Sequence, residues 1–518
     1  MRFIKSRWLA GISALLALML ATLGQVEATK RPRYGGTLRV QVHVASLSLD
    51  PREWKAGSAT TADSERLGSL VFDRLLTLDE YGRFQPVLAT EWSHDGTAKN
   101  WQFKIRPGVK FSDGSVLTAK DVVAALQPLM PVGLTISSGE NAVTIHSLRT
   151  VPDLLEQLAS GRYFVFKAQG GNATPLGTGP FVLAETTPAA PSEANPSVLM
   201  PAKMKFRANE EYWAGRPFLD AIDVTLGDPP LRQIMNMQVG RAEIIDIPPD
   251  LVRKARQENL RVWASAPEIL LALRFDEGQP ATQDARLREA LDLSLDRETM
   301  ANVLLQRQAQ PAESLLPQWL SGYAFLFGEP MNLDRAKELR AALPANAAGG
   351  TEPLRMRVDA TGDLMKLLGE RVAVNARQAN LSVQLVPHAA GSGANPAGTT
   401  APATGLRLFA WHYDTLSPRV ELQEIAQYLH AETGAESANE SANPEKLFAD
   451  ERALLDTRQV LPLVVLPEYV GIASNVRNWS VGPSGEWRLA DVWLDTAESA
   501  ASNGDGSGEP NAARGVHP

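Results

Sequence analysis

Cysteine is missing from this 518-residue chain, and its absence excludes several kinds of chemistry at once. The chain can form no disulfide, thiolate metal site, cysteine nucleophile or lipidated-cysteine anchor. The seven histidines show neither the H-x-x-H nor the H-E-x-x-H spacing that zinc sites favour. We therefore expect neither a metal site nor a cofactor.

Catalytic and nucleotide-binding motifs are missing as well. The chain contains no G-x-S-x-G nucleophile motif and no G-x-x-x-x-G-K-[ST] phosphate loop, so it is not itself an ATPase. A formal net charge of −8 argues against nucleic acid as a partner. We expect a protein that is not an enzyme; a secreted hydrolase stays open as an alternative.

Long apolar runs are confined to the first 28 residues. Arg2, Lys5 and Arg7 precede an apolar run from Leu9 to Leu23, and Val26-Glu27-Ala28 fits a small-x-small cleavage site. The run is short for a membrane span, which needs ~20 apolar residues. Residues 1–28 are predicted to be a cleavable signal peptide, with an uncleaved anchor as the alternative. The mature chain is then exported, most simply into a periplasm.

The stretch from Leu75 to Leu126 carries the clearest local signals. Residues 101–105 alternate aromatic or aliphatic with polar side chains, which is typical of a strand buried on one face. Asp113-Gly114 indicates a tight turn. Thr118 and Asp121 then have the spacing of a capping box at the start of a helix. These patterns predict an α+β unit without catalytic side chains.

Several further motifs follow one another in a fixed order. Most are turns or helix starts that taken singly say little about function. The order is Gly35-Gly36-Thr37-Leu38, Leu49-Asp50-Pro51, G-x-F-x-P-x-L-A-x-x-W at 82–92, R-P-G-V-K-F at 106–111, P-L-G-T-G-P-F at 175–181, N-E-E-Y-W-A-G-R-P at 209–217 and D-R-A-K-E-L at 334–339.

This order resembles that of the peptide/nickel family of solute-binding proteins, the family 5 extracellular receptors of ABC importers. The resemblance implies an α/β fold of the periplasmic binding protein type II kind, in which two lobes close on a ligand cleft. It also implies an extra α+β domain, which we expect to be trimmed after Leu129. The expected segments are domain I (30–50, 175–262 and 477–495), domain II (51–174), domain III (263–476) and a disordered tail (496–518).

One segment is expected to carry ligand chemistry. Trp411, Asp414 and Pro418 match the W-x-x-D-x-x-x-P pattern of the family's peptide-binding members, in which the Asp meets the ligand's α-ammonium group. The resemblance makes Asp414 the amine-anchor candidate, and Tyr413 could wall the cleft together with Trp411. An exposed loop carboxylate and core packing of the two aromatics are the alternatives.

The loop before Leu49-Asp50-Pro51 is expected to line the same cleft, through Ser46 and Leu47, because the family's corresponding loop does. The resemblance implies an oligopeptide-binding or dipeptide-binding protein that captures a peptide or another amine-bearing small molecule. Its partners would be ABC permease subunits at the inner membrane, and we expect a monomer. A periplasmic receptor or chaperone that has kept the fold and lost transport is the alternative.

Overall fold

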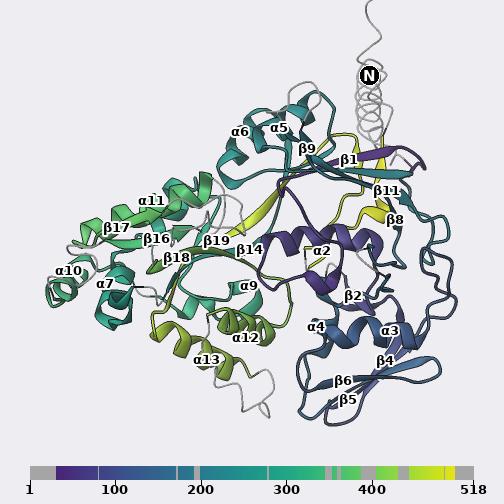
Figure 1. Ribbon diagram of the computed structural model, residues 1–518, viewed down its shortest axis with the longest axis horizontal. Helices are drawn as coiled ribbons and strands as arrows, with labels where there is room; N and C mark the ends of the chain where they lie inside the picture. Colours follow the sequence, from purple (N-terminus) through teal and green to yellow (C-terminus); the bar gives the residue numbers. More distant parts are fainter. Residues whose placement is uncertain are drawn as a thin grey trace, which may run out of the picture.

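The computed structural model describes residues 31–495, with gaps at 80, 171–172, 192–198, 277–278, 329, 345–352, 359–362, 387–403, 430–442 and 484. The expected signal peptide (1–28) and the expected disordered tail (496–518) lie outside the described residues. In Figure 1 the molecule divides into a right-hand part, a left-hand part and the strands that join them.

A single mixed sheet runs through both parts of the molecule. Its strand order is β17-β16-β18-β14-β19-β13-β1-β12-β11-β8, with β15 added beside β19. The first lobe contributes β1 (Thr37–Val42), β8 (Phe181–Thr187), β11 (Ala202–Ala208), β12 (Ala221–Leu226) and β13 (Ile244–Asp246). The second lobe contributes β15 (Gln310–Pro311), β16 (Leu354–Val358), β17 (Val383–Val386) and β18 (Leu406–His412).

Two long antiparallel strands join the lobes: β14 (Arg261–Phe275) and β19 (Val460–Ile472). Pro267 faces Pro467 at the point where their register is irregular. Because proline cannot donate a hydrogen bond to a neighbouring strand, the ladder is weakened there. We propose that this point is the hinge between the lobes, and we call Pro267 and Pro467 the hinge prolines.

A small α+β unit extends from the first lobe, as the sequence predicts. Its sheet has the order β4-β5-β7-β6, and α3 (Ala119–Leu126) packs on it at the lower right of Figure 1. Thr118 and Asp121 form the predicted capping box. The predicted strand at 101–105 lies within β5, whereas β6 was not predicted. The strands are β4 (Ala89–His94), β5 (Asn100–Ile105), β6 (Leu134–Ser138) and β7 (Ala142–Ser147).

Helices cover both lobes, and α2 (Ala59–Val71) lies centrally between them in Figure 1. The other helices of the first lobe are α4 (Leu154–Leu158), α5 (Pro230–Gln238) and α6 (Val252–Gln257). Those of the second lobe are α7 (Ala285–Ser294), α8 (Arg297–Thr299), α9 (Gln318–Ser321), α10 (Leu333–Ala341), α11 (Asp363–Gln378), α12 (Pro418–Tyr428) and α13 (Pro444–Asp456). None of the described helices combines the length and apolar character needed to cross a membrane.

Short strand pairs complete the fold. They are β2 (Leu76–Leu78) with β3 (Phe84–Pro86), β9 (Ala190–Pro191) with β10 (Leu199–Met200), and β20 (Val476–Arg477) with β21 (Trp493–Leu494). The last pair returns the chain to the first lobe, where the backbone N–H of Phe218 donates to the Ala490 carbonyl. We propose that the three expected domains keep their sequence-based boundaries within this architecture.

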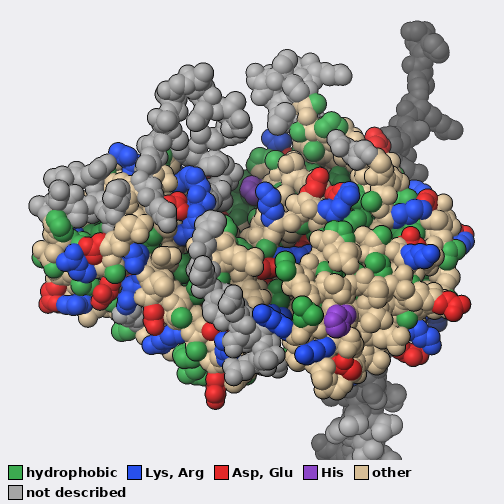
Figure 2. All heavy atoms as spheres, turned by 60° about the horizontal axis from the view of Figure 1, so that its bottom comes forward, with side chains coloured by type: hydrophobic (Ala, Val, Ile, Leu, Met, Phe, Trp, Pro, Cys, Tyr) green, Lys and Arg blue, Asp and Glu red, His purple; other side chains and the backbone are tan. Residues whose placement is uncertain are grey.

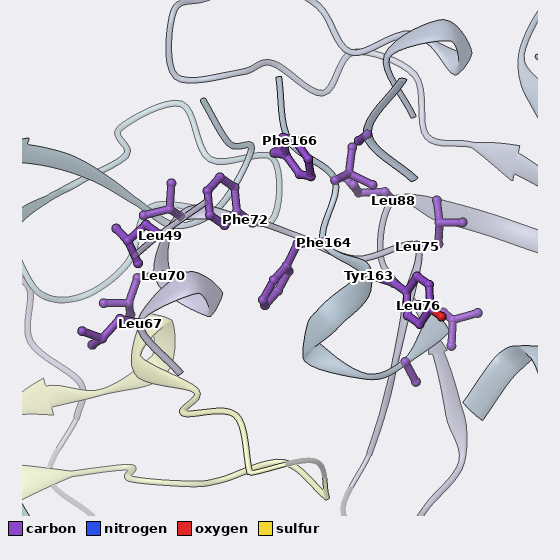
Figure 3. Close-up of a cluster of buried hydrophobic side chains, with 14 of the residues drawn as sticks. Leu49, Leu67, Leu70, Phe72, Leu75, Leu76, Leu88, Tyr163, Phe164 and Phe166 are labelled. Atoms are coloured by element: carbon purple, nitrogen blue, oxygen red, sulfur yellow. The ribbon is translucent and has the colours of Figure 1, made fainter. Parts of the chain in front are cut away.

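A buried aromatic and aliphatic cluster holds α2 in place (Figure 3). Phe72 lies 5.9 Å from Phe164 between ring centroids, and both rings are buried with Leu67 and Leu70 of α2. Fully burying a side chain of this size contributes about 1.5–3 kcal/mol. The cluster therefore gives α2 a rigid position, which matters because α2 carries charged side chains toward the second lobe.

The end of α2 depends on two glycines of the predicted P-L-G-T-G-P-F motif. The Gly179 N–H donates to the Val71 carbonyl at 2.8 Å. A Cβ at Gly177 would lie only 1.8 Å from that same carbonyl oxygen. The motif is thus a close backbone approach at the end of the helix, which terminates at Val71.

We expect Gly177→Ala to destabilise the protein, because its Cβ would collide with backbone that cannot move away. Overpacking of this kind costs about 1–3 kcal/mol. The measurement is the midpoint of chemical unfolding. Gly96→Ala is the matched control, since a Cβ there meets nothing within 4 Å. Equal midpoints for the two variants would contradict the close approach.

Candidate functional site

Where the two lobes meet, they enclose a small polar cavity of about 20 Å³. A space of this size holds about one water molecule. The backbone N–H of His412 donates to the Gly57 carbonyl beside it, so the lobes are in contact. The lining residues are Ala62, Glu65, Arg66, Gly161, Glu268, His412, Tyr413, Asp414, Glu468, Gly485 and Glu486.

Three parts of the fold bring the charged side chains of the cavity together. Glu65 and Arg66 come from α2 of the first lobe, and Asp414 follows β18 of the second lobe. Glu268 and Glu468 directly follow the two hinge prolines on β14 and β19. The cavity therefore lies against the hinge, and opening the lobes would pull its lining apart.

Asp414, the predicted amine anchor, is buried with 6% of its surface exposed and already holds a cation. Its Oδ2 accepts a hydrogen bond from Arg162 Nη2 at 2.7 Å. Arg162 belongs to the short helix η3 (Gly161–Tyr163) of the first lobe and also pairs with Glu424 on α12. The other oxygen, Asp414 Oδ1, is buried without a hydrogen-bond partner.

The charge of Arg162 is maintained by the second lobe. Burial acts to lower the pKa of its guanidinium, but the nearby carboxylates of Asp414 and Glu424 more than offset this, so the pKa is raised. Arg162 thus stays protonated and is held between two carboxylates of the second lobe. The sequence analysis did not single out this residue, since no local pattern marks it.

A second ion pair joins the lobes with the charges reversed. Asp153 of the first lobe accepts hydrogen bonds from Arg419 Nη2 at 2.9 Å and from the Ser417 hydroxyl, both at the start of α12. Asp153 and Ser417 are buried. Each lobe therefore offers a cation to the other, and the closed arrangement is stabilised by the protein's own side chains.

Arg66 forms a third charged link at the cavity. It pairs with Asp63 at 2.8 Å on its own helix and with Glu468 on β19. His412 Nδ1 lies 3.6 Å from Glu468. Burial, together with the positive charge of Arg66, lowers the pKa of His412 to about 3, so this imidazole is neutral at physiological pH.

Two carboxyl groups of the cavity differ from the others. Glu65 is 8% exposed, and its Oε1 has no hydrogen-bond partner. Burial raises the pKa of Glu65 well above its usual range, and the neighbouring Asp414 raises it further. Burial also raises the pKa of Glu268 to about 7. In the closed structure, burial therefore disfavours the charged form of both carboxyls.

The remaining predicted site residues have different surroundings. Trp411 is buried, and its Nε1–H donates to Glu421 at 2.5 Å. Tyr413 lines the cavity but directs its hydroxyl to the Leu315 carbonyl at 2.6 Å. Ser46 is exposed and Leu47 is half-buried, and neither is among the cavity's lining residues. The structure therefore brings Asp414 and Tyr413 to one cavity, with Trp411 in the packing behind them.

Metal-ligating side chains do not converge in the part of the chain that the structure describes. No group of three or more His, Asp or Glu residues there has the geometry to hold a metal ion. The charged side chains of the cavity instead act on one another, as hydrogen-bonded pairs and as buried acids.

Solved structures of several binding proteins share this fold. The oligopeptide-binding protein AppA of Bacillus subtilis, in complex with a nonapeptide, superposes with a TM-score of 0.72 at 16% identity, covering 90% of this chain and 100% of AppA. The NikA protein of Staphylococcus aureus, in complex with Ni(L-His)2, superposes with a TM-score of 0.67 at 18% identity, covering 89% of this chain and 100% of NikA.

Sequence comparison points to the same group of proteins. The nickel-binding protein NikA of Staphylococcus aureus is 22% identical over 386 residues, covering 71% of this chain and 72% of that protein. The probable di/tripeptide-binding protein 5 of Pseudomonas aeruginosa is also 22% identical, over 361 residues, covering 61% of this chain and 64% of that protein. Residues 83–427 match the bacterial extracellular solute-binding proteins, family 5. The chain belongs to this family.

Proposed function

We propose that the chain captures a peptide or another amine-bearing small molecule between its lobes and delivers it to the permease subunits of an ABC importer. It acts as a monomeric binding protein rather than an enzyme. Its signal peptide sends it to the periplasm, where Asp414 holds the ligand's ammonium group, Tyr413 and Trp411 support that site, and Ser46 and Leu47 border the entrance.

One observation carries this proposal: the buried Asp414 has an oxygen without a partner, facing the place where two hinged lobes meet. An ionised carboxylate in such a place is strongly favourable only when a cation reaches it. A ligand ammonium group has three donors and can bind Oδ1 while Arg162 keeps Oδ2.

Entry of a ligand requires the lobes to open, since the closed cavity has room for about one water. The two strands at Pro267 and Pro467 permit this movement. Opening would separate Arg162 from its partners on the second lobe and make room for a ligand between the lobes. In the absence of a ligand, the ion pairs favour the closed form.

The names of relatives support the class of ligand. Matched proteins are named as nickel-binding, di/tripeptide-binding and heme-binding proteins, and AppA was solved with a nonapeptide. Among these ligands, an amine-bearing solute agrees best with the unpartnered Oδ1 of Asp414, because an ammonium group can donate a hydrogen bond to it. A receptor or chaperone without a transport role is the alternative that would bind ligand and yet support no uptake.

Binding of short peptides tests the proposal. Calorimetry of the mature protein against di- to pentapeptides should show binding, and Asp414→Asn should weaken it by about 30-fold or more, since unpairing a buried charge costs about 2 kcal/mol at least. Asp456→Asn, whose side chain is 71% exposed, is the matched control and should bind like wild type.

Two results would remove the proposal. The first is no binding to any of the peptides, and the second is turnover of a peptide or ester substrate in place of stable binding. If Asp414→Asn bound peptides with unchanged affinity, the proposed role of Asp414 would be wrong, while the proposal that the protein binds peptides would be kept.

Replacing Arg162 tests the closed form. Arg162→Met leaves Asp414 and Glu424 buried without their cation, and breaking such a pair costs about 3–5 kcal/mol. Opening the lobes relieves this cost by hydrating both carboxylates. We expect small-angle scattering to show a larger radius of gyration than for wild type. Arg335→Met, at an exposed pair with Glu338, should leave the radius unchanged.

The ligand-free closed form should depend on pH. Because the pKa of Glu268 is about 7 when buried and near 4.5 when hydrated, closure binds a proton between these values. Closure is therefore favoured below pH 4.5 and loses this advantage as the pH rises to 7. The other titratable groups that line the cavity with Glu268 are Glu65, Arg66, His412, Tyr413, Asp414, Glu468 and Glu486.

Scattering at pH 5 and pH 8 measures this effect, with a larger radius expected at pH 8. Glu268→Gln, which cannot titrate, should reduce the difference. A wild-type radius that is the same at both pH values would show that the buried acids do not act on closure.

A further inference from the structure

The carboxyl groups around the cavity outnumber the cations that can neutralise them. Arg66 is shared by Asp63 and Glu468, and Arg162 is shared by Asp414 and Glu424. Glu486 lies 3.6 Å from both Arg74 and Arg488. In the described part of the chain, this leaves Glu65 and Glu268 as cavity carboxyls with no ion pair.

Glu65 and Glu268 belong to two parts of the molecule that would move relative to each other when the lobes open. Glu65 is fixed on α2, whose position the Phe72–Phe164 cluster determines, and Glu268 follows the hinge proline of β14. A cation held between them would therefore link α2 to the hinge. Closure would become the step that completes its coordination.

Glu65 and Glu268 each pack against the backbone of a glycine. A Cβ at Gly161 would lie 2.6 Å from Glu65 Oε2, and one at Gly485 would lie 3.3 Å from Glu268 Oε2. Gly485 also has a positive φ of 78°, which disfavours any other residue. Each carboxyl therefore has a glycine, without a side chain, as its neighbour. Glu65, which lines the cavity, has a buried oxygen, Oε1, that accepts no hydrogen bond.

We propose that Glu65 and Glu268 form a second cation subsite that receives a basic side chain of the solute, in addition to the ammonium group at Asp414. The cognate ligand is then a small molecule or short peptide with at least two cationic groups. This inference rests on the proposed capture of a solute between the lobes.

An organic cation fits this subsite better than a metal ion does. Two carboxylates can accept the hydrogen bonds of one alkylammonium or guanidinium group, each of which carries several donors. A metal site would need more ligands than these two, and no third ligand converges in the described chain. Burial favours the protonated form of both groups in the absence of ligand, and a bound cation would favour their charged form.

Calorimetry with matched tripeptides tests the subsite. The probes are Ala-Lys-Ala and Ala-norleucine-Ala, which differ in the side-chain ammonium group, and 1,5-diaminopentane as a cation without a peptide bond. We expect wild type to bind Ala-Lys-Ala at least 10-fold more tightly than Ala-norleucine-Ala. Glu65→Gln and Glu268→Gln should each reduce this preference to about twofold or less.

Glu451→Gln is the matched control. Glu451 is a buried acid of the second lobe whose burial raises its pKa to about 7, as for Glu268, but it binds the backbone of Leu315 and Leu316 away from the cavity. Its variant should keep the full preference for lysine. A loss of preference in this control as well would mean that neutralising any buried acid is sufficient, and would overturn the inference.

Proton release gives a second readout that needs no variant. Wild type titrated at pH 6.5 in two buffers of different ionisation enthalpy should release more protons with Ala-Lys-Ala than with Ala-norleucine-Ala. This measurement decides the question even if a glutamine variant folds poorly. Equal proton release with the two tripeptides would overturn the subsite.

The outcomes separate the two proposals. If the two tripeptides bind equally well, the second subsite falls and peptide capture stands. If only 1,5-diaminopentane binds, and does so through Glu65 and Glu268, the subsite stands and peptide capture falls. If none of the three probes binds, both proposals fall.

Discussion

The guanidinium of Arg162, held between Asp414 and Glu424, determines how the two lobes meet. A buried cation must have partners, and these partners lie more than 250 residues away in the chain, on the other lobe. Asp153 with Arg419 repeats the arrangement in the opposite sense. Because each lobe neutralises a charge of the other, closure does not depend on a ligand, and a ligand acts by adding to contacts that already exist.

The hinge prolines are adjacent in the chain to charged side chains that line the cavity. Glu268 and Glu468 directly follow the prolines at which β14 and β19 lose their regular register, and both line the cavity. Burial raises the pKa of Glu268, so opening of the lobes that hydrates this carboxyl would favour its charged form. In the proposed mechanism, protonation, cation binding and closure are linked through the same few side chains.

The distribution of charge differs between the surface and the cavity. On the face visible in Figure 2, acidic and basic side chains are interspersed, as on an ordinary soluble domain. Between the lobes, the cavity is lined by five carboxyl groups and one arginine. A net charge of −8 says little about a ligand, but this local excess of buried acid favours a cation.

The sequence by itself determined the local elements and the family. Strand β5 and the Thr118 capping box follow from short patterns, because their signals lie within a few residues of one another. Only the tertiary structure decided what surrounds Asp414. Arg162, Glu65 and Glu268 carry no local signal. Which buried charges face each other depends on contacts between distant segments, and periodicity does not encode those contacts.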